Sequence, residues 1–188
     1  MTTLEAPAKT RWTAAKYLSL AAPDDNKLYE VLDGELIMSP APNAHHQEIT
    51  FNVAKLLDAF VRANKLGKVY VSPLDVVLSD ELAEPDVIFV SVERKSIVGP
   101  QRVTGAPDLV VEVLSLSTAR RDLRYKWDLY ARSGVREYWI VNPDAKTVEV
   151  LTLVRNAYER HTLAEGDTPV TSKVLEGFSA SVKDVFAE

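Results

Sequence analysis

The sequence contains no cysteine among its 188 residues. Disulfides, thiolate nucleophiles and cysteine-ligated zinc or iron–sulfur sites are therefore excluded, and a metal site in this chain would use oxygen ligands and its three histidines. Long apolar runs are also missing, since none approaches the roughly 18 consecutive apolar residues of a transmembrane helix. The first residues, MTTLEAPAKTRW, lack the apolar stretch of a signal peptide. These absences predict a cytoplasmic protein.

Two further features limit the possible functions. The formal net charge of -5 argues against a protein whose main role is to coat nucleic acid, although an acidic chain can carry local basic patches. The sequence has neither a P-loop nor the glycine fingerprint of a dinucleotide-binding fold, so no nucleotide cofactor is expected. Its length and its 46% hydrophobic content fit one domain over 1–188, with residues 1–11 as a flexible tail.

Apolar periodicity predicts three helices. A short helix is expected over 12–21, and a long one from Asn43 to about Leu66, with Gly67 as its C-cap. A further amphipathic helix is expected over 119–133, where a glycine again follows the last residue.

Strands alternate with these helices. The sequence LYEVLDGELIMSP predicts a hairpin that turns at Asp33-Gly34. Further strands are expected over 68–72, 74–78, 85–91 and 108–114, and three more follow the last helix. The fold class is therefore predicted as α/β or α+β, with a mixed sheet flanked by helices.

One carboxylate stands out in the strand 108–114. Glu112 lies within the apolar run LVVEV, where an unpaired carboxylate costs several kcal/mol unless a cation meets it. At about 100° per residue, the helix 119–133 turns Lys126 toward its apolar stripe of Leu123, Trp127 and Tyr130. Lys126 is thus predicted to lean toward the sheet and pair with Glu112. A purely structural ion pair is the alternative interpretation.

Two more acids occupy the starts of other strands. Glu35 opens the second strand of the hairpin, and Asp86 follows Pro85 at the start of the strand 85–91. Three acids on separate strands with one lysine form the side-chain inventory of a divalent-metal phosphodiesterase site. Residue spacing alone does not establish such a site.

The chain resembles the restriction-endonuclease-like family often called Uma, within the PD-(D/E)xK nuclease superfamily. The resemblance covers nearly the whole chain, through VLDGELIMSPAP, HHQE, EPDVIFVSVER, GAPDLVVEVLSLSTARRDLRYKWDLYARSGVREYWIVNP and LEGFSASVKDVF. It implies a restriction-endonuclease-like core with an extra N-terminal hairpin and C-terminal strands, and a hydrolase that cleaves DNA phosphodiester bonds with Mg²⁺, for which Mn²⁺ can substitute. Glu35, Asp86 and Glu112 match the three motif acids, with Asp86 and Glu112 as the metal ligands.

The sequence departs from the superfamily pattern at the lysine. That pattern has lysine two residues after the third acid, where this chain has Leu114. Lys126 is similar to a lysine that has migrated to the following helix, so it is the expected catalytic lysine.

The letters PD also occur twice, at Asp86 and at Asp108. Four residues at roughly 3.3 Å each separate Asp108 from Glu112 by about 13 Å along one strand, which is too far for them to share an ion. Asp86 is therefore assigned to the metal, and Asp108 to the start of the strand.

Several polar residues carry weaker signals. His45 and His46 continue the apolar face of the long helix, and a structural role is favoured over metal ligation. Arg120, Arg121 and Arg124 are either phosphate contacts or part of a solvated helix face.

Two alternatives follow for the whole protein. DNA is the expected partner, and a homodimer is expected because cutting both strands of a duplex calls for two sites. The competing hypothesis is a catalytically inactive nuclease-fold module that binds nucleic acid or another protein, since Leu114 replaces the usual lysine and the chain is acidic.

Overall fold

The computed structural model describes residues 11–20, 27–39, 41–115 and 119–187, and their side chains except those of 119–122. Of the expected N-terminal tail, only Arg11 falls within the described residues. Among helices in the described ranges, none combines the length and the apolarity needed to cross a bilayer.

A six-stranded sheet forms the centre of the molecule. Its strand order is β11-β10-β9-β8-β6-β3, and β8 runs parallel to β9 while the other neighbours are antiparallel. The sheet is therefore mixed, as predicted. The strands are β3 (Gly67–Val71), β6 (Val87–Ser91), β8 (Leu109–Val113), β9 (Glu137–Asn142), β10 (Thr147–Val154) and β11 (Ala157–Ala164).

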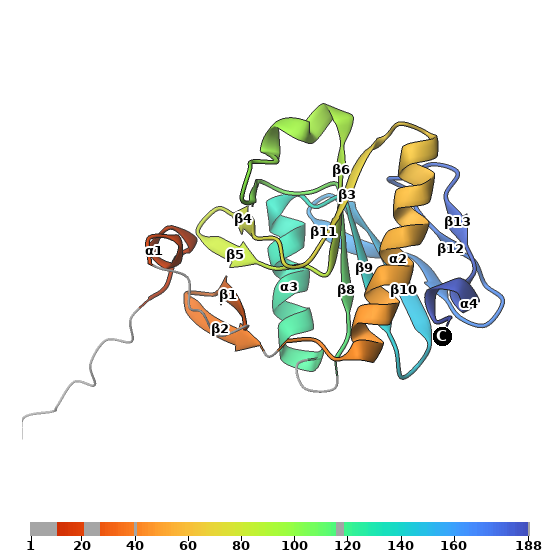
Figure 1. Ribbon diagram of the computed structural model, residues 1–188, viewed down its shortest axis with the longest axis horizontal. Coiled ribbons are helices and arrows are strands. Elements are labelled where there is room, and N and C mark those ends of the chain that lie inside the picture. Colours follow the sequence, from red (N-terminus) through yellow and green to blue (C-terminus); the bar gives the residue numbers. More distant parts are fainter. Residues whose placement is uncertain (1–10, 21–26, 40, 116–118, 188) are drawn as a thin grey trace, which may run out of the picture.

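Helices cover both faces of this sheet. In Figure 1, α2 (Ala44–Ala63) and α3 (Ala119–Ser133) lie on opposite sides of β8 and β9. Val111 packs in the same cluster as residues of α2, whereas its neighbour Val110 packs with residues of α3. Glu112 alternates with Val111 and thus belongs to the face that α3 covers. The predicted architecture of a sheet flanked by helices is confirmed.

The long helix ends earlier than predicted. It begins at the N-cap Asn43, whose side-chain oxygen accepts a hydrogen bond from the backbone N–H of His46 at 2.9 Å. It ends at Ala63, and Gly67 is not its cap but the first residue of β3, with φ of +154°. A Cβ at Gly67 would overlap the carbonyl oxygen of Val90 on β6, so close strand packing explains this glycine.

The predicted hairpin is present and belongs to a second, five-stranded sheet. Its strands β1 (Leu28–Leu32) and β2 (Glu35–Ser39) turn at Asp33 and Gly34, which both have positive φ. The backbone N–H of Asp33 donates to the Tyr125 hydroxyl of α3 at 2.8 Å, which ties the turn to that helix. This sheet has the order β2-β1-β5-β4-β7 and includes β4 (Val76–Leu78), β5 (Glu81–Ala83) and β7 (Val103–Thr104).

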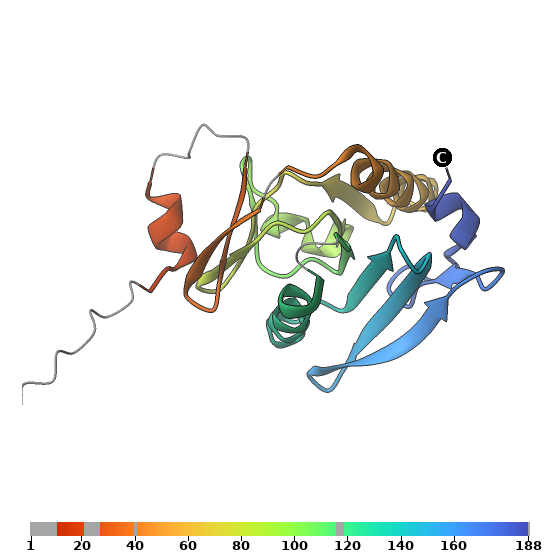
Figure 2. The same ribbon diagram turned by 90° about the horizontal axis from the view of Figure 1, so that it is seen from below.

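Short elements complete the fold. Helix α1 (Ala14–Leu18) lies beside the five-stranded sheet, and Figure 2 shows the C-terminal elements at the opposite end. The remaining elements are the 3-10 helix η1 (Val92–Ile97), the strands β12 (Val170–Thr171) and β13 (Ser179–Ala180), and the helix α4 (Val182–Val185).

A fully buried carboxylate fixes the C-terminal segment to the main sheet. Glu137, at the start of β9, has 0% exposed surface. Its Oε1 accepts hydrogen bonds from Trp139 Nε1 at 2.7 Å and Ser172 Oγ at 2.6 Å. Its Oε2 accepts from the backbone N–H groups of Lys173 at 2.6 Å and Val174 at 3.1 Å. Both carboxylate oxygens are therefore satisfied by four donors within the protein.

Candidate active site

Strand pairing brings two of the predicted acids together. Because β6 and β8 are antiparallel and Val87 lies opposite Val111, Asp86, which immediately precedes β6, lies beside Glu112 of β8. Asp86 Oδ2 accepts a hydrogen bond from the backbone N–H of Val113 at 2.7 Å. The pairing of β6 with β8 thus places the two carboxylates side by side.

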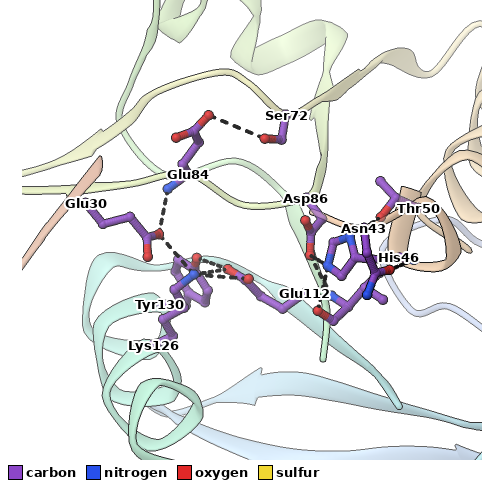
Figure 3. Close-up of polar contacts among 11 residues, drawn as sticks. Glu30, Asn43, His46, Thr50, Ser72, Glu84, Asp86, Glu112, Lys126 and Tyr130 are labelled. Carbon is purple, nitrogen blue, oxygen red and sulfur yellow. Dashed lines mark hydrogen bonds and ion pairs between the residues drawn. The ribbon is translucent and has the colours of Figure 1, made fainter. Parts of the chain in front are cut away.

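Lys126 of α3 reaches Glu112 as the helical projection predicts. Its Nζ donates to Glu112 Oε1 at 3.0 Å and to Oε2 at 3.1 Å. The same ammonium lies 2.9 Å from Oε1 of Glu30, a β1 residue that the sequence analysis did not select. Figure 3 shows Lys126 between the two carboxylates. All three residues are buried.

Two further contacts hold these carboxylates in place. The hydroxyl of Tyr130, one turn beyond Lys126 on α3, donates to Glu112 Oε1 at 2.6 Å. The backbone N–H of Glu84 donates to Glu30 Oε1 at 2.9 Å. Helix α3, β1 and the segment before β6 thus meet at this cluster.

Burial and charge act in opposite directions on the central pair. Burial raises the pKa of the Glu112 carboxyl, because the charged form loses its hydration, and Lys126 opposes that rise. Burial alone would lower the pKa of Lys126, but the charges of Glu112 and Glu30 outweigh it and raise that pKa well above its usual value. Lys126 therefore stays an ammonium, shared by two carboxylates.

The acids line a cavity of about 220 Å³ at the ends of β6 and β8 where Asp86 and Glu112 lie. Glu30, Glu84, Asp86 and Glu112 contribute the carboxylates, and Lys126 and His46 contribute the basic groups. The cavity is thus rich in oxygen atoms of the kind that hard divalent cations prefer.

His46 faces this cavity from the first turn of α2. Its Nε2 lies 3.0 Å from the carbonyl oxygen of Val113 and 3.5 Å from Asp86 Oδ2. Burial lowers the pKa of His46, but the hydrogen bond and charge of Asp86 outweigh it, so the pKa is raised. The neighbouring His45 is exposed. His46 is thus the histidine of the pair that contacts an acid of the cluster.

Comparison with known proteins assigns the chain to a family. Residues 14–183 match the family described as "Uma2: Putative restriction endonuclease". The chain belongs to the Uma2 family. The resemblance inferred from the sequence motifs is therefore confirmed.

Two further proteins are similar to this chain. An uncharacterized protein of Synechocystis sp., sll1609, is 29% identical over 140 residues, which cover 73% of this chain and 78% of that protein. A crystal structure of "a putative nuclease belonging to DUF820" from Anabaena variabilis matches with a TM-score of 0.78 at 22% identity, over 93% of this chain and 97% of that one. This likeness shows a common fold, and membership of the Uma2 family supports a nuclease.

The acid that joins the cluster from the hairpin is Glu30 and not Glu35. Glu35 is opposite Leu32, whereas Glu30 is opposite Ile37, farther from the turn. Glu35 instead lines a separate cavity of about 310 Å³ beside Arg124. The predicted set is therefore only partly brought together: Asp86, Glu112 and Lys126 meet, and Glu35 lies apart from them.

The sequence signal for Glu30 and Glu84 was weak. Glu84 lies two residues before Asp86, which is the spacing of residues on one face of an extended chain, and this spacing could have drawn attention to it. Glu30 is another acid on the hairpin that carries Glu35, and nothing in the local pattern distinguishes the two. Only the packing of the two sheets determines which one meets Lys126.

The remaining candidates have other positions. Asp108 immediately precedes β8 and accepts hydrogen bonds from the backbone N–H of Ser91 at 2.8 Å and from Arg136 at 3.2 Å. It therefore anchors a strand start, away from the cavity. Arg124 is exposed, while the side chains of Arg120 and Arg121 lie outside the described residues.

The donor set fits a divalent ion that keeps part of its water shell. Within the described parts of the chain, no group of three or more His, Asp or Glu side chains is arranged to hold an ion by itself. Mg²⁺ commonly binds through one or two carboxylates and completes its octahedral shell with water and substrate phosphate oxygens. Asp86 and Glu112 meet that requirement, because both carboxylates lie at one cavity.

The pKa of Glu84 allows the repulsion between the carboxylates around this cavity to be tested through the pH dependence of stability. Burial and the charges of Asp75 and Glu30 raise the pKa of Glu84 to about 7. The native state then binds this proton more tightly than the unfolded state, so stability falls as pH rises from about 4.5 to about 7. Without metal, Glu84→Gln should stabilise the protein by about 1–2 kcal/mol at about pH 8, since partial exposure reduces the full effect.

The measurement is urea unfolding of both proteins in EDTA. At about pH 5 the gain from Glu84→Gln should be much smaller, because the native carboxyl is then mostly protonated. An equal gain at both pH values would show that the effect does not come from the charge of Glu84.

Proposed function

We propose that this Uma2 protein is a divalent-metal-dependent endonuclease that hydrolyses DNA phosphodiester bonds. The observation that carries the proposal is the convergence on one cavity of Asp86, immediately before β6, Glu112 of β8 and Lys126 of α3. Paired carboxylates with a nearby ammonium suit phosphoryl chemistry, in which negative charge develops on oxygen.

Asp86 and Glu112 would hold the ion, with Mg²⁺ as the expected metal and Mn²⁺ as a substitute. When bound, the ion would supply Lewis acidity at the phosphate and lower the pKa of a coordinated water. Asp86 is held for this role by its hydrogen bond from the Val113 backbone. The contact of His46 with the Val113 carbonyl oxygen also holds the end of β8 in place.

Lys126 would supply positive charge beside the phosphate. Its ammonium is kept charged by Glu112 and Glu30, and it can donate to a water molecule or to a phosphate oxygen. Lys126 takes the part that the superfamily gives to a strand lysine, since Leu114 occupies the strand position. In this proposal Glu30 replaces Glu35 as the assisting acid.

DNA is the proposed substrate, and a homodimer is the proposed assembly for cutting a duplex. The described part of one chain contains one such cluster, while cleavage of both strands at one place calls for two. A two-fold symmetric pair would present two equivalent sites to the two antiparallel strands.

Cleavage assays test the proposal through Lys126. Supercoiled plasmid and single-stranded circular DNA are incubated with Mg²⁺, Mn²⁺ or EDTA, and nicked and linear products are measured. Wild type should cut only with metal, and Lys126→Met should cut at least about 100-fold more slowly, because a buried charge that stabilises the transition state is lost. Lys55→Met, which changes an exposed lysine of α2, should leave the rate unchanged.

Two other outcomes would contradict the role of Lys126 or the nuclease proposal itself. If Lys126→Met cuts DNA at the wild-type rate, Lys126 takes no part in the reaction, and the metal-dependent mechanism does not use this lysine. If the folded protein cuts no DNA with any metal, the alternative of an inactive nuclease-fold binding module gains the support, since Leu114 stands where the superfamily has its lysine.

A further inference from the structure

Lys126 already occupies the carboxylate to which an ion would bind. Its Nζ lies within hydrogen-bonding distance of both oxygens of Glu112, at 3.0 and 3.1 Å. Tyr130 also donates to Oε1, so this oxygen has two donors in the buried cluster. An ion bound by Glu112 would need at least one of these oxygens, and its positive charge would repel the ammonium. The ion and Lys126 therefore compete for Glu112.

Glu30 offers the displaced ammonium a second partner. Its Oε1 lies 2.9 Å from Lys126 Nζ, so the lysine can leave Glu112 without losing its only carboxylate. Glu30 belongs to β1 of the five-stranded sheet, and the backbone N–H of Glu84 holds its Oε1 at 2.9 Å. Its position is thus set independently of β8, the strand that carries Glu112.

We propose that Glu30 is a positioning residue that retains the Lys126 ammonium at the site when a divalent ion takes Glu112. This inference rests on the proposed metal site at Asp86 and Glu112. Without Glu30, metal binding would leave a buried ammonium with no carboxylate, which is costly. Glu30 therefore favours metal binding without being a ligand itself.

If Glu30 has no positioning role, a different result is expected. Any carboxylate near the cavity attracts a cation, so Glu30→Gln would weaken binding through charge alone. Glu84→Gln provides the matched control, because it removes a carboxylate from the same cavity. In the described residues, the Glu84 side chain has a hydrogen bond from Ser72 and none from Lys126. At about pH 8 Glu84 is ionised, since its pKa is about 7.

The experiment measures Mn²⁺ affinity by titration calorimetry and by the electron paramagnetic resonance of free Mn²⁺, at about pH 8 and without DNA. Glu30→Gln should weaken Mn²⁺ binding about tenfold, the size expected for loss of one charge-assisted hydrogen bond. Glu84→Gln should weaken it by clearly less. Lys126→Met should tighten binding, because the competitor is gone, and in that background Glu30→Gln should have no more effect than Glu84→Gln.

The outcomes separate this inference from the proposed function. If wild type binds no Mn²⁺, or if Asp86→Asn leaves binding unchanged, the metal site itself is wrong. If binding depends on Asp86 but Glu30→Gln and Glu84→Gln weaken it equally, only the positioning role of Glu30 is overturned. Should Lys126→Met fail to fold, the comparison of Glu30→Gln with Glu84→Gln decides the inference alone.

Discussion

Replacing Asp86 by asparagine should abolish metal-dependent cleavage. In the proposed site Asp86 is an ion ligand, and loss of the ion's contribution of several kcal/mol corresponds to a rate at least about 10³-fold lower. The fold should survive, because the amide oxygen of asparagine can still accept the hydrogen bond from the Val113 backbone. Mg²⁺ or Mn²⁺ should raise the melting temperature of the wild type, and in Asp86→Asn this rise should disappear together with the activity.

Asp128→Asn is the matched control for this result. Asp128 is an exposed acid of α3 that lines the separate cavity beside Glu35. Its substitution changes the net charge equally, and both the rate and the metal-induced thermal shift should remain. Metal-stimulated cutting by Asp86→Asn at the wild-type rate would refute the assignment of Asp86 to the metal.

Replacing Glu137 should give the largest loss of stability. Its two carboxylate oxygens accept four hydrogen bonds in a fully buried place, and glutamine would turn an NH₂ group toward some of these donors. Unsatisfied buried donors cost about 1–3 kcal/mol each, so Glu137→Gln should destabilise the protein by about 2–4 kcal/mol. For a chain of this length the melting temperature should fall by roughly 5–15 °C.

Thermal and urea unfolding measure this effect, with Glu149→Gln as the control. Glu149 pairs with Arg160 between β10 and β11 at the surface, where such pairs contribute about 0–1 kcal/mol. A loss for Glu137→Gln no larger than that of Glu149→Gln would show that the C-terminal segment does not depend on this carboxylate.

The parts of the site that local rules govern were predictable from sequence. Helical periodicity predicts that Lys126 faces the sheet. Asp108 and Glu112 are too far apart along one strand to bind the same ion, so the sequence favours Asp86, on another strand, as the second ligand. Glu30 was not predictable, because the choice between it and Glu35 depends on how the five-stranded sheet packs against α3. That packing involves residues far apart in sequence, such as the Tyr125 hydroxyl that holds the backbone of Asp33.

The fold shows the same division. Strong signals, such as the Asp33-Gly34 turn and the apolar stripe of α2, gave elements that the structure contains. The short strands β5 and β7 were not anticipated, because three and two residues carry no periodicity. Gly67 was assigned to the wrong role, since its requirement comes from the nearby Val90 backbone and not from the helix before it.

The positions of the four cluster residues along the chain limit when the cluster can form during folding. Glu112 and Lys126 lie on the consecutive elements β8 and α3, but Glu30 and Asp86 come from earlier parts of the chain, and bringing them to this pair carries the loop-closure entropy of long-range contacts. No hairpin or helix that forms early contains both Lys126 and either of its acids. The cluster therefore assembles only when both sheets and α3 have docked, and a growing chain on the ribosome lacks it until α3 has emerged. Under the proposed function, the growing chain would therefore be unable to cut DNA before α3 has emerged.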